Sequence, residues 1–280
     1  MQGRLLLITW LAMAGVAQAA PHEHGVPAAE GRAKPAAWSA LPLLLPVGGR
    51  GGERDGAQLR PVGIAASELL VFAPDGSQKS YPVDAEGARI RSAAPTQGNY
   101  HWVLAREETP THVGIASTTW YFSNPGPAPA KLLARQKAEL EITPSPLPRE
   151  HGSYRESEKW RFAVLFMGQA LAGKSLRMET EGGSRSVVQT DQNGIATVLF
   201  PRDFAASKGG GHGRPKMNFV LAVEHEAGGK HYRTTFNHTY TPDADRNRSL
   251  AWGGAFLLAG MLGAAPLLRR RAANNQRPEA

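Results

Sequence analysis

The feature that most constrains this chain is an almost uninterrupted apolar run over residues 251–268, which arginines 269–271 follow directly. At 1.5 Å per residue, a helix of that length covers about 27 Å, close to the hydrocarbon thickness of a bilayer. Basic residues favour the cytoplasmic side of a membrane. We therefore expect a transmembrane helix over residues 249–268, a cytoplasmic basic tail over residues 269–280, and every upstream residue outside the cytoplasm.

The N-terminus has the three parts of a secretory signal peptide. A basic start that contains Arg4 precedes an apolar stretch over residues 5–16, and the small residues at 17–19 form a cleavage pattern. We predict a signal peptide over residues 1–19. An uncleaved first membrane helix is the alternative, which the short apolar stretch disfavours. The predicted location is the inner (cytoplasmic) membrane, crossed once, with periplasmic N-terminal domains and a cytoplasmic C-terminus.

The chain contains no cysteine. Outside the cytoplasm disulfides are permitted but not required, so stability must come from the packed cores alone. The lack of thiols excludes thiol catalysis and thiolate metal sites, which leaves histidine, carboxylates and backbone groups as metal ligands. The net charge is +8, but no basic stripe with interleaved aromatic residues is present. We therefore expect no nucleic-acid partner.

Residues 20–57 are rich in proline, alanine and glycine, and this composition predicts a flexible leader. One apolar patch interrupts the leader, at Trp38 and residues 41–47. Its prolines confine any strand there to the edge of a sheet. We therefore expect this patch to form an edge strand that docks on the first domain.

Two β-rich regions follow, at residues 58–130 and 131–245. Short apolar runs separated by turn residues fill both, for example residues 69–72, which end before an Asp-Gly turn. Strands spaced by about 8–12 residues with regular turns favour a sandwich. A short basic helix over residues 130–138 marks the junction. The predicted fold is mainly β: two tandem small β-sandwich domains, immunoglobulin-like or prealbumin-like, plus one C-terminal transmembrane helix.

Two turns stand out in the second region. Residues 191–194 end in Asn-Gly, which suits the positive φ angles of a tight turn between strands. Residues 219–226 and 231–240 flank Gly228 and Gly229 and predict a long hairpin with a two-residue turn. A two-residue turn fixes the partner of every residue along such a hairpin.

This hairpin carries three histidines. Its register pairs Glu226 with His231, and side chains alternate between the two faces of a strand. His225 and His238 therefore share one face, separated along it by about 20 Å, whereas His231 lies on the other. We do not expect the three rings to bind one ion. The local pair that remains is His231 with Glu226 or Glu224.

A second histidine cluster follows the predicted cleavage point. Histidine is the natural transition-metal ligand of a chain without cysteine. An amine with a third-position His22 can wrap a metal in a square plane through the intervening amides, but Pro21 has no N–H to ionise. The flexible site that remains combines the amine, His22, His24 and Glu23. A solvated polar leader is the alternative.

The remaining residues suggest no chemistry beyond this. His101 and His112 are candidates to face one another on adjacent strands, in a register that the sequence leaves open. His151 and His212 lie in polar loops and are expected to be solvated. The chain has no nucleophile elbow, zincin helix, phosphate loop or dinucleotide fingerprint. We predict no enzyme activity, no catalytic residues and no cofactor-binding residues.

Several segments together resemble a known family. They are residues 139–144, 162–173, 190–194, 222–226 and 230–232, with residues 69–76 and 98–100 of the first region. Their order and spacing resemble a bacterial family of unknown-function domains described as the periplasmic component of nickel or cobalt uptake systems. The resemblance implies a signal peptide, tandem β-sandwiches, a role beside a membrane permease, and histidines near the mature N-terminus, where His22 and His24 lie.

Three hypotheses follow. The leading one is a non-enzymatic, membrane-anchored periplasmic accessory protein for nickel or cobalt uptake. The ion is its cargo and only cofactor, His22, His24, His225 and His231 are the metal ligands, and a permease or other envelope protein is the partner. The alternative is an anchored β-sandwich adhesion or scaffold module of the cell envelope. In the third, the C-terminal segment is a sorting signal that a protease removes.

Overall fold

The fold is built almost entirely from β-strands, in a computed structural model of the chain. The structure describes residues 38–48, 56–92, 100–122, 128–149, 152–205, 215–243 and 253–264. The strands are β1 (Leu43–Pro46), β2 (Gly56–Val62), β3 (Glu68–Phe72), β4 (Gln78–Pro82), β5 (Ala88–Arg91), β6 (Tyr100–Glu108), β7 (His112–Tyr121), β8 (Leu140–Pro144), β9 (Tyr154–Arg155), β10 (Lys159–Phe166), β11 (Gln169–Ala170), β12 (Ser175–Thr180), β13 (Arg185–Gln189), β14 (Ile195–Leu199), β15 (Met217–Ala227) and β16 (Lys230–Thr241). The prediction of a mainly-β protein with multiple sheets is confirmed.

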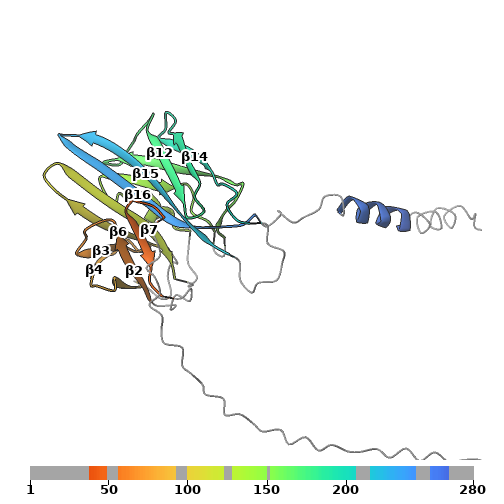
Figure 1. Cartoon of the computed structure of the whole chain (residues 1–280), viewed down its shortest axis with the longest axis horizontal. Coiled ribbons are helices and arrows are strands. Elements are labelled where there is room, and N and C mark those ends of the chain that lie inside the picture. The colour runs from red at the N-terminus through yellow and green to blue at the C-terminus, as the bar shows by residue number, and fades with distance from the viewer. Residues whose placement is uncertain are drawn as a thin grey trace, which may run out of the picture. The chain divides into compact units, whose positions relative to one another are not determined.

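The strands form three sheets. The largest has nine strands, eight of them in the order β13-β12-β15-β16-β7-β6-β3-β4, while β9 pairs with β16 off this path. A three-stranded sheet has the order β1-β2-β5, and a four-stranded sheet contains β11, β10 and β14 with β8 paired to β10. Figure 1 shows the long strands β15 and β16 running beside β7 and β6.

The large sheet continues across the predicted domain boundary at residues 130 and 131. β7, from the first predicted region, pairs in parallel with β16, from the second, over the register His231↔His112 to Phe236↔Ser117. The side chains of Ser117 and Thr118 add hydrogen bonds to the carbonyls of Thr235 and Asn237, at 2.8 and 2.7 Å. The two regions thus share one sheet. The domain limits themselves stay a prediction.

Two cores lie on opposite faces of this sheet, because alternate residues of a strand point to opposite sides. Trp102 and Leu104 of β6 belong to a large, aromatic-rich core that they share with the four-stranded sheet. Val103 and Ala105, one residue along in each case, belong to a smaller aliphatic core beneath the three-stranded sheet. The large sheet is therefore the middle layer between the other two.

The predicted edge strand forms as β1, at the edge of the three-stranded sheet. It also contacts the second region. The backbone of Leu44 donates to and accepts from the side-chain amide of Asn237, both at 2.8 Å, and Leu43 packs with Val220 and Ala222. The last part of the predicted flexible leader is therefore a strand that ties both regions together.

The junction helix is shorter than predicted. α1 covers Ala130–Ala134, and Arg135 already has the extended angles φ −72° and ψ 135°. Beyond it the chain is held by the buried Glu141, whose carboxylate accepts hydrogen bonds from the backbone N–H groups of Lys137 and Ala138. The ammonium of Lys137 lies 3.1 Å from the same carboxylate. These contacts replace the helical bonds and end the helix.

The C-terminal segment is described in part. Residues 253–264 are helical. Over the described part of the chain, no helix combines the length and apolar character needed to cross a membrane. The predicted signal peptide lies outside the described residues, as do residues 269–280 of the predicted tail.

Candidate functional site

The β15–β16 hairpin forms in the predicted register. Glu226 pairs with His231, His225 with Tyr232 and Phe219 with His238. Gly228 and Gly229 both adopt positive φ, 58° and 73°, as a two-residue turn of this type requires. The prediction that His225, His231 and His238 do not converge is confirmed, because His231 lies on the face opposite the other two.

His225 and His238 lie on the face of the aromatic core. The ring of His225 meets Phe166 edge-on at 4.5 Å between centroids, and its Nδ1 has no hydrogen-bond partner among the described residues. His238 packs against Tyr154 at 5.5 Å and Phe236 at 6.5 Å. Burial lowers the pKa of both rings and so disfavours their protonated forms. Their surroundings are those of packed side chains.

His231 meets a histidine that the sequence did not assign to it. The parallel register places it beside His112, and the two Nδ1 atoms are 3.2 Å apart. The rings are nearly parallel, at 17° between planes and 5.4 Å between centroids. His112 and His231 are the imidazole pair. The backbone N–H of His231 donates to the carbonyl of Thr111, and that of His112 to the hydroxyl of Thr109, so both backbones are held.

A carboxylate lies near the Nε2 atom of each ring of the imidazole pair. Nε2 of His231 is 3.6 Å from Glu224, and Nε2 of His112 is 4.0 Å from Glu107. Glu107 is held in turn by the backbone N–H of Ala65, at 2.8 Å. Burial alone would raise the pKa of Glu224, but the hydrogen bond from Arg233 and nearby positive charge lower it on balance. Both imidazoles thus lie beside carboxylates.

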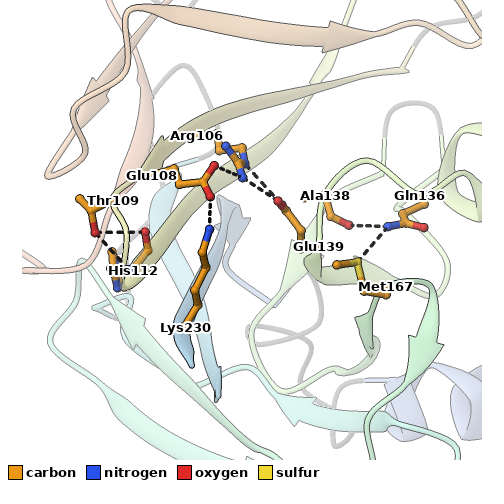
Figure 2. A network of polar contacts seen from close by, with 9 residues as sticks. All are labelled: Arg106, Glu108, Thr109, His112, Gln136, Ala138, Glu139, Met167 and Lys230. Carbon is orange, nitrogen blue, oxygen red and sulfur yellow. Dashed lines mark hydrogen bonds and ion pairs between the residues drawn. The ribbon is translucent and has the colours of Figure 1, made fainter. Parts of the chain in front are cut away.

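The opposite face of the same sheet end carries a chain of ion pairs (Figure 2). Lys230 binds Glu108, Glu108 binds Arg106 at 2.8 Å, and Arg106 binds Glu139 at 2.6 Å. The hydrogen bond from Lys230, followed by that from Arg106, lowers the pKa of Glu108. The chain links β16 and β6 to the residue before β8. Each charge in it has an opposite charge beside it, so we assign it a structural role.

The structure places the other histidine candidates apart. His101 pairs with Trp120 across β6 and β7 and is buried against Phe122. It does not face His112, so that candidate pairing is wrong. The reason is register: His101 lies near the start of β6, whereas His112 opens β7 beyond the far end of β6. His22 and His24 lie outside the described residues.

Among the described residues, no three histidine, aspartate or glutamate side chains are grouped closely enough to hold a metal ion on their own. The imidazole pair therefore supplies two nitrogen donors and leaves the other positions open. An open hollow of about 470 Å³ lies at the hairpin tip beside it, lined by residues that include Thr111, Glu226 and His231. The hollow gives solvent access to His231.

Comparison with known proteins gives no family. No family model and no curated protein matches the chain. Among solved structures, a bacterial ice-binding adhesin involved in host cell surface retention has 14% identity and a TM-score of 0.24; the match covers 73% of this chain and 65% of that one. A Ca²⁺-stabilized adhesin of an Antarctic bacterium has 12% identity and a TM-score of 0.23, with coverage of 72% and 49%. A two-domain fibronectin type III segment of chicken tenascin has 12% identity and a TM-score of 0.22, with coverage of 71% and 98%. Likeness at this level bears on no residue and no function of this chain, which spans less than two thirds of either adhesin structure.

Proposed function

We propose that this protein is a non-enzymatic scaffold of the cell envelope that docks an extended strand of a partner protein along β13. The observation that carries this proposal is the edge of the nine-stranded sheet. Among the described strands β13 pairs with β12 alone, and the side chain of Val187 on it is 59% exposed. An open edge offers backbone hydrogen bonds to an added strand.

The two edges of this sheet differ in how they are protected. The other edge strand, β4, carries Lys79 and ends at Pro82, two devices that discourage strand addition. β13 contains no proline, and its one charged side chain, Arg185, donates to the carbonyl of Trp38 at 3.0 Å and lies 3.5 Å from Glu179. Arg185 is thus engaged within the protein, which favours β13 as the docking edge.

The parallel pairing of β7 with β16 favours a protein that binds a partner on an exposed surface over one that closes two domains around a small ligand. A protein that closes two domains on a small ligand needs a hinge between them. Here a six-pair ladder and the β1 contacts to Asn237 join the two regions. We therefore infer that the two joined regions bind a partner on an exposed surface.

Site-specific photo-crosslinking in living cells tests this proposal. A crosslinking amino acid at position 187 of the full-length protein should give an adduct of one discrete size, and a chelator should leave its yield unchanged. The same amino acid at Met167, which is 51% exposed in the turn after β10, is the matched control. Val187→Lys should abolish partner recovery while Met167→Lys preserves it. Equal adducts at both positions, or none at position 187, would overturn the proposal.

The nickel or cobalt uptake role remains a second candidate, and one observation favours it. His231, one of the four sequence-based metal candidates, lies with a second imidazole within 3.2 Å at a solvent-accessible position. Under this proposal the protein would present an ion to a neighbouring permease, with membrane attachment through the C-terminal segment. Uptake of Ni²⁺ or Co²⁺ by cells that carry His231→Gln, compared with His225→Gln, tests it. Equal uptake in the two variants would exclude this use of His231.

A further inference from the structure

We propose that the imidazole pair, His112 and His231, is a binding site for a divalent transition-metal ion, with both Nδ1 atoms as ligands. The spacing of the two atoms carries the first step. A tetrahedral ion with metal–nitrogen bonds of about 2.0–2.1 Å holds two such nitrogens about 3.3 Å apart. The two Nδ1 atoms are already 3.2 Å apart. The spacing of the two nitrogens therefore matches that of two ligands of one ion.

The carboxylates beside the two rings also favour a metal site. Metal-binding histidines typically donate their other ring N–H to a carboxylate, which fixes the tautomer. Glu224 lies 3.6 Å from Nε2 of His231 and Glu107 lies 4.0 Å from Nε2 of His112. Both carboxylates lie on the Nε2 side of their rings, at distances longer than a hydrogen bond. When a cation binds the two Nδ1 atoms, the proton of each neutral ring is on Nε2, on the side where its carboxylate lies.

The environment favours an exchangeable ion. The side chains of His112 and His231 are 29% and 33% exposed, and two protein nitrogens leave coordination positions for water. Glu226 pairs with His231 across the hairpin on the same face and lines the adjacent hollow, so its carboxylate is a candidate for a third ligand. The positive charges nearby are engaged: Arg233 binds Glu224 at 2.8 Å and Lys230 binds Glu108.

The choice of ion follows from the donor atoms. Imidazole nitrogens suit Zn²⁺, Ni²⁺ and Cu²⁺, whereas Mg²⁺ and Ca²⁺ require oxygen ligands. A site with two nitrogens and open positions is a holding or transfer site, since a closed structural zinc site has four protein ligands. This inference does not depend on strand docking at β13, which involves another edge of the sheet and no metal.

Chemical footprinting of the wild-type, full-length protein tests the site without any mutation. Diethyl pyrocarbonate acylates accessible, unprotonated imidazole nitrogens, and mass spectrometry locates each modified ring. With ZnCl₂ present, His112 and His231 should both lose modification, and the extent of modification at His225 on the opposite face should not change. A parallel arm with MgCl₂ should protect neither ring. Unchanged modification of His112 and His231 by Zn²⁺ would overturn the proposal and leave the pair as two rings sharing a proton.

Titration of variants gives the second measurement. The background is full-length protein with His22→Gln and His24→Gln, so that the leader does not contribute. In it, His112→Gln and His231→Gln should each weaken Zn²⁺ binding by about tenfold or more, and Glu224→Gln should weaken it by about tenfold through the lost backing contact. Two matched controls, His225→Gln and Glu108→Gln, should keep the parent affinity.

The outcomes separate this proposal from the two functions above. Equal Zn²⁺ affinity in His231→Gln and His225→Gln would overturn the metal site, and strand docking at β13 would stand unaffected. A confirmed metal site with no change in cellular nickel or cobalt uptake would leave the site and remove the uptake role. If a variant does not fold, footprinting of the wild-type protein still tests the metal site, because it requires no substitution.

Discussion

Histidine side chains have different surroundings on the two faces of the β15–β16 hairpin. On one face His225 and His238 pack against aromatic rings, and burial lowers their pKa. On the other face His231, one residue along from His225's partner Tyr232, lies between an imidazole and a carboxylate. The residue type and the strands are the same. What differs is whether the ring meets carbon or polar atoms.

This difference separates a packing role from a binding role. A neutral ring in aromatic surroundings stabilises the protein by filling space, and a metal there would have to displace packed carbon atoms. A ring beside polar donors and solvent can exchange a proton or an ion at small cost. His225, a metal candidate on the sequence alone, belongs to the first class, and His231 to the second.

Truncation of one residue on each face of β16 tests this difference, with the largest expected effect on the aromatic face. Phe236→Ala should cost about 3–5 kcal/mol of unfolding free energy, since it removes a fully buried ring that stacks on Trp102 at 5.5 Å. Urea denaturation at pH 7 measures this cost. Arg233→Ala, on the polar face, is the matched control and should cost at most about 1 kcal/mol. Similar costs for the two variants would contradict the difference in packing between Phe236 and Arg233 on the two faces of β16.

Metal binding should stabilise the protein through the polar face alone. At a Zn²⁺ concentration of about 100 times Kd, the native state should gain about 2.7 kcal/mol. The gain should appear as a raised urea midpoint, disappear on addition of a chelator, and be absent in His231→Gln. His225→Gln should keep it. A gain of equal size in both variants would mean that the ion binds elsewhere on the chain.

The β15–β16 hairpin shows which structural features can be predicted from the sequence alone. Gly228 and Gly229 specify a two-residue turn, the turn sets the register, and alternation then assigns the face of each histidine. All of these steps depend on neighbours in sequence. The edge position of β1 was equally local, since Pro42 and Pro46 forbid a central strand. These predictions agree with the observed pairing of β1 and β16.

The imidazole pair could not be predicted from the sequence, because it depends on the pairing of two strands that are distant along the chain. His112 and His231 are 119 residues apart and meet only through the parallel β7–β16 ladder. Nothing local specifies which strand lies beside β16. One weak signal was present: each histidine lies at the start of a strand, His112 as the first residue of β7 and His231 as the second residue of β16. Polar residues at matching strand starts can share a sheet end, but many pairs satisfy that condition.

The pH dependence of stability should come mainly from the aromatic face. Burial lowers the pKa of His238 below its ordinary value of 6.5. The unfolded chain therefore binds a proton more readily, so stability is complete above pH 6.5 and falls as the pH drops toward the folded pKa. Within that window the slope from one such group is at most about 1.4 kcal/mol per pH unit.

Urea midpoints of the metal-free protein between pH 8 and pH 5 measure this slope. His238→Gln should flatten the profile, because it removes the titrating ring. A pH profile that His238→Gln leaves unchanged would contradict the assignment of this slope to His238.

The smallest effect is expected from the ion pairs at the sheet end. Lys230→Gln removes the partner that holds the pKa of Glu108 below its ordinary 4.5. A lowered carboxyl pKa stabilises the native state above that value, and the contribution is lost as the pH falls through the folded pKa. Both groups are exposed, and added salt screens the pair. The wild-type and Lys230→Gln midpoints should therefore differ slightly at pH 7 in low salt and coincide at pH 3 or in 1 M NaCl. A difference that survives both treatments would show that Lys230 acts through packing at the hairpin tip.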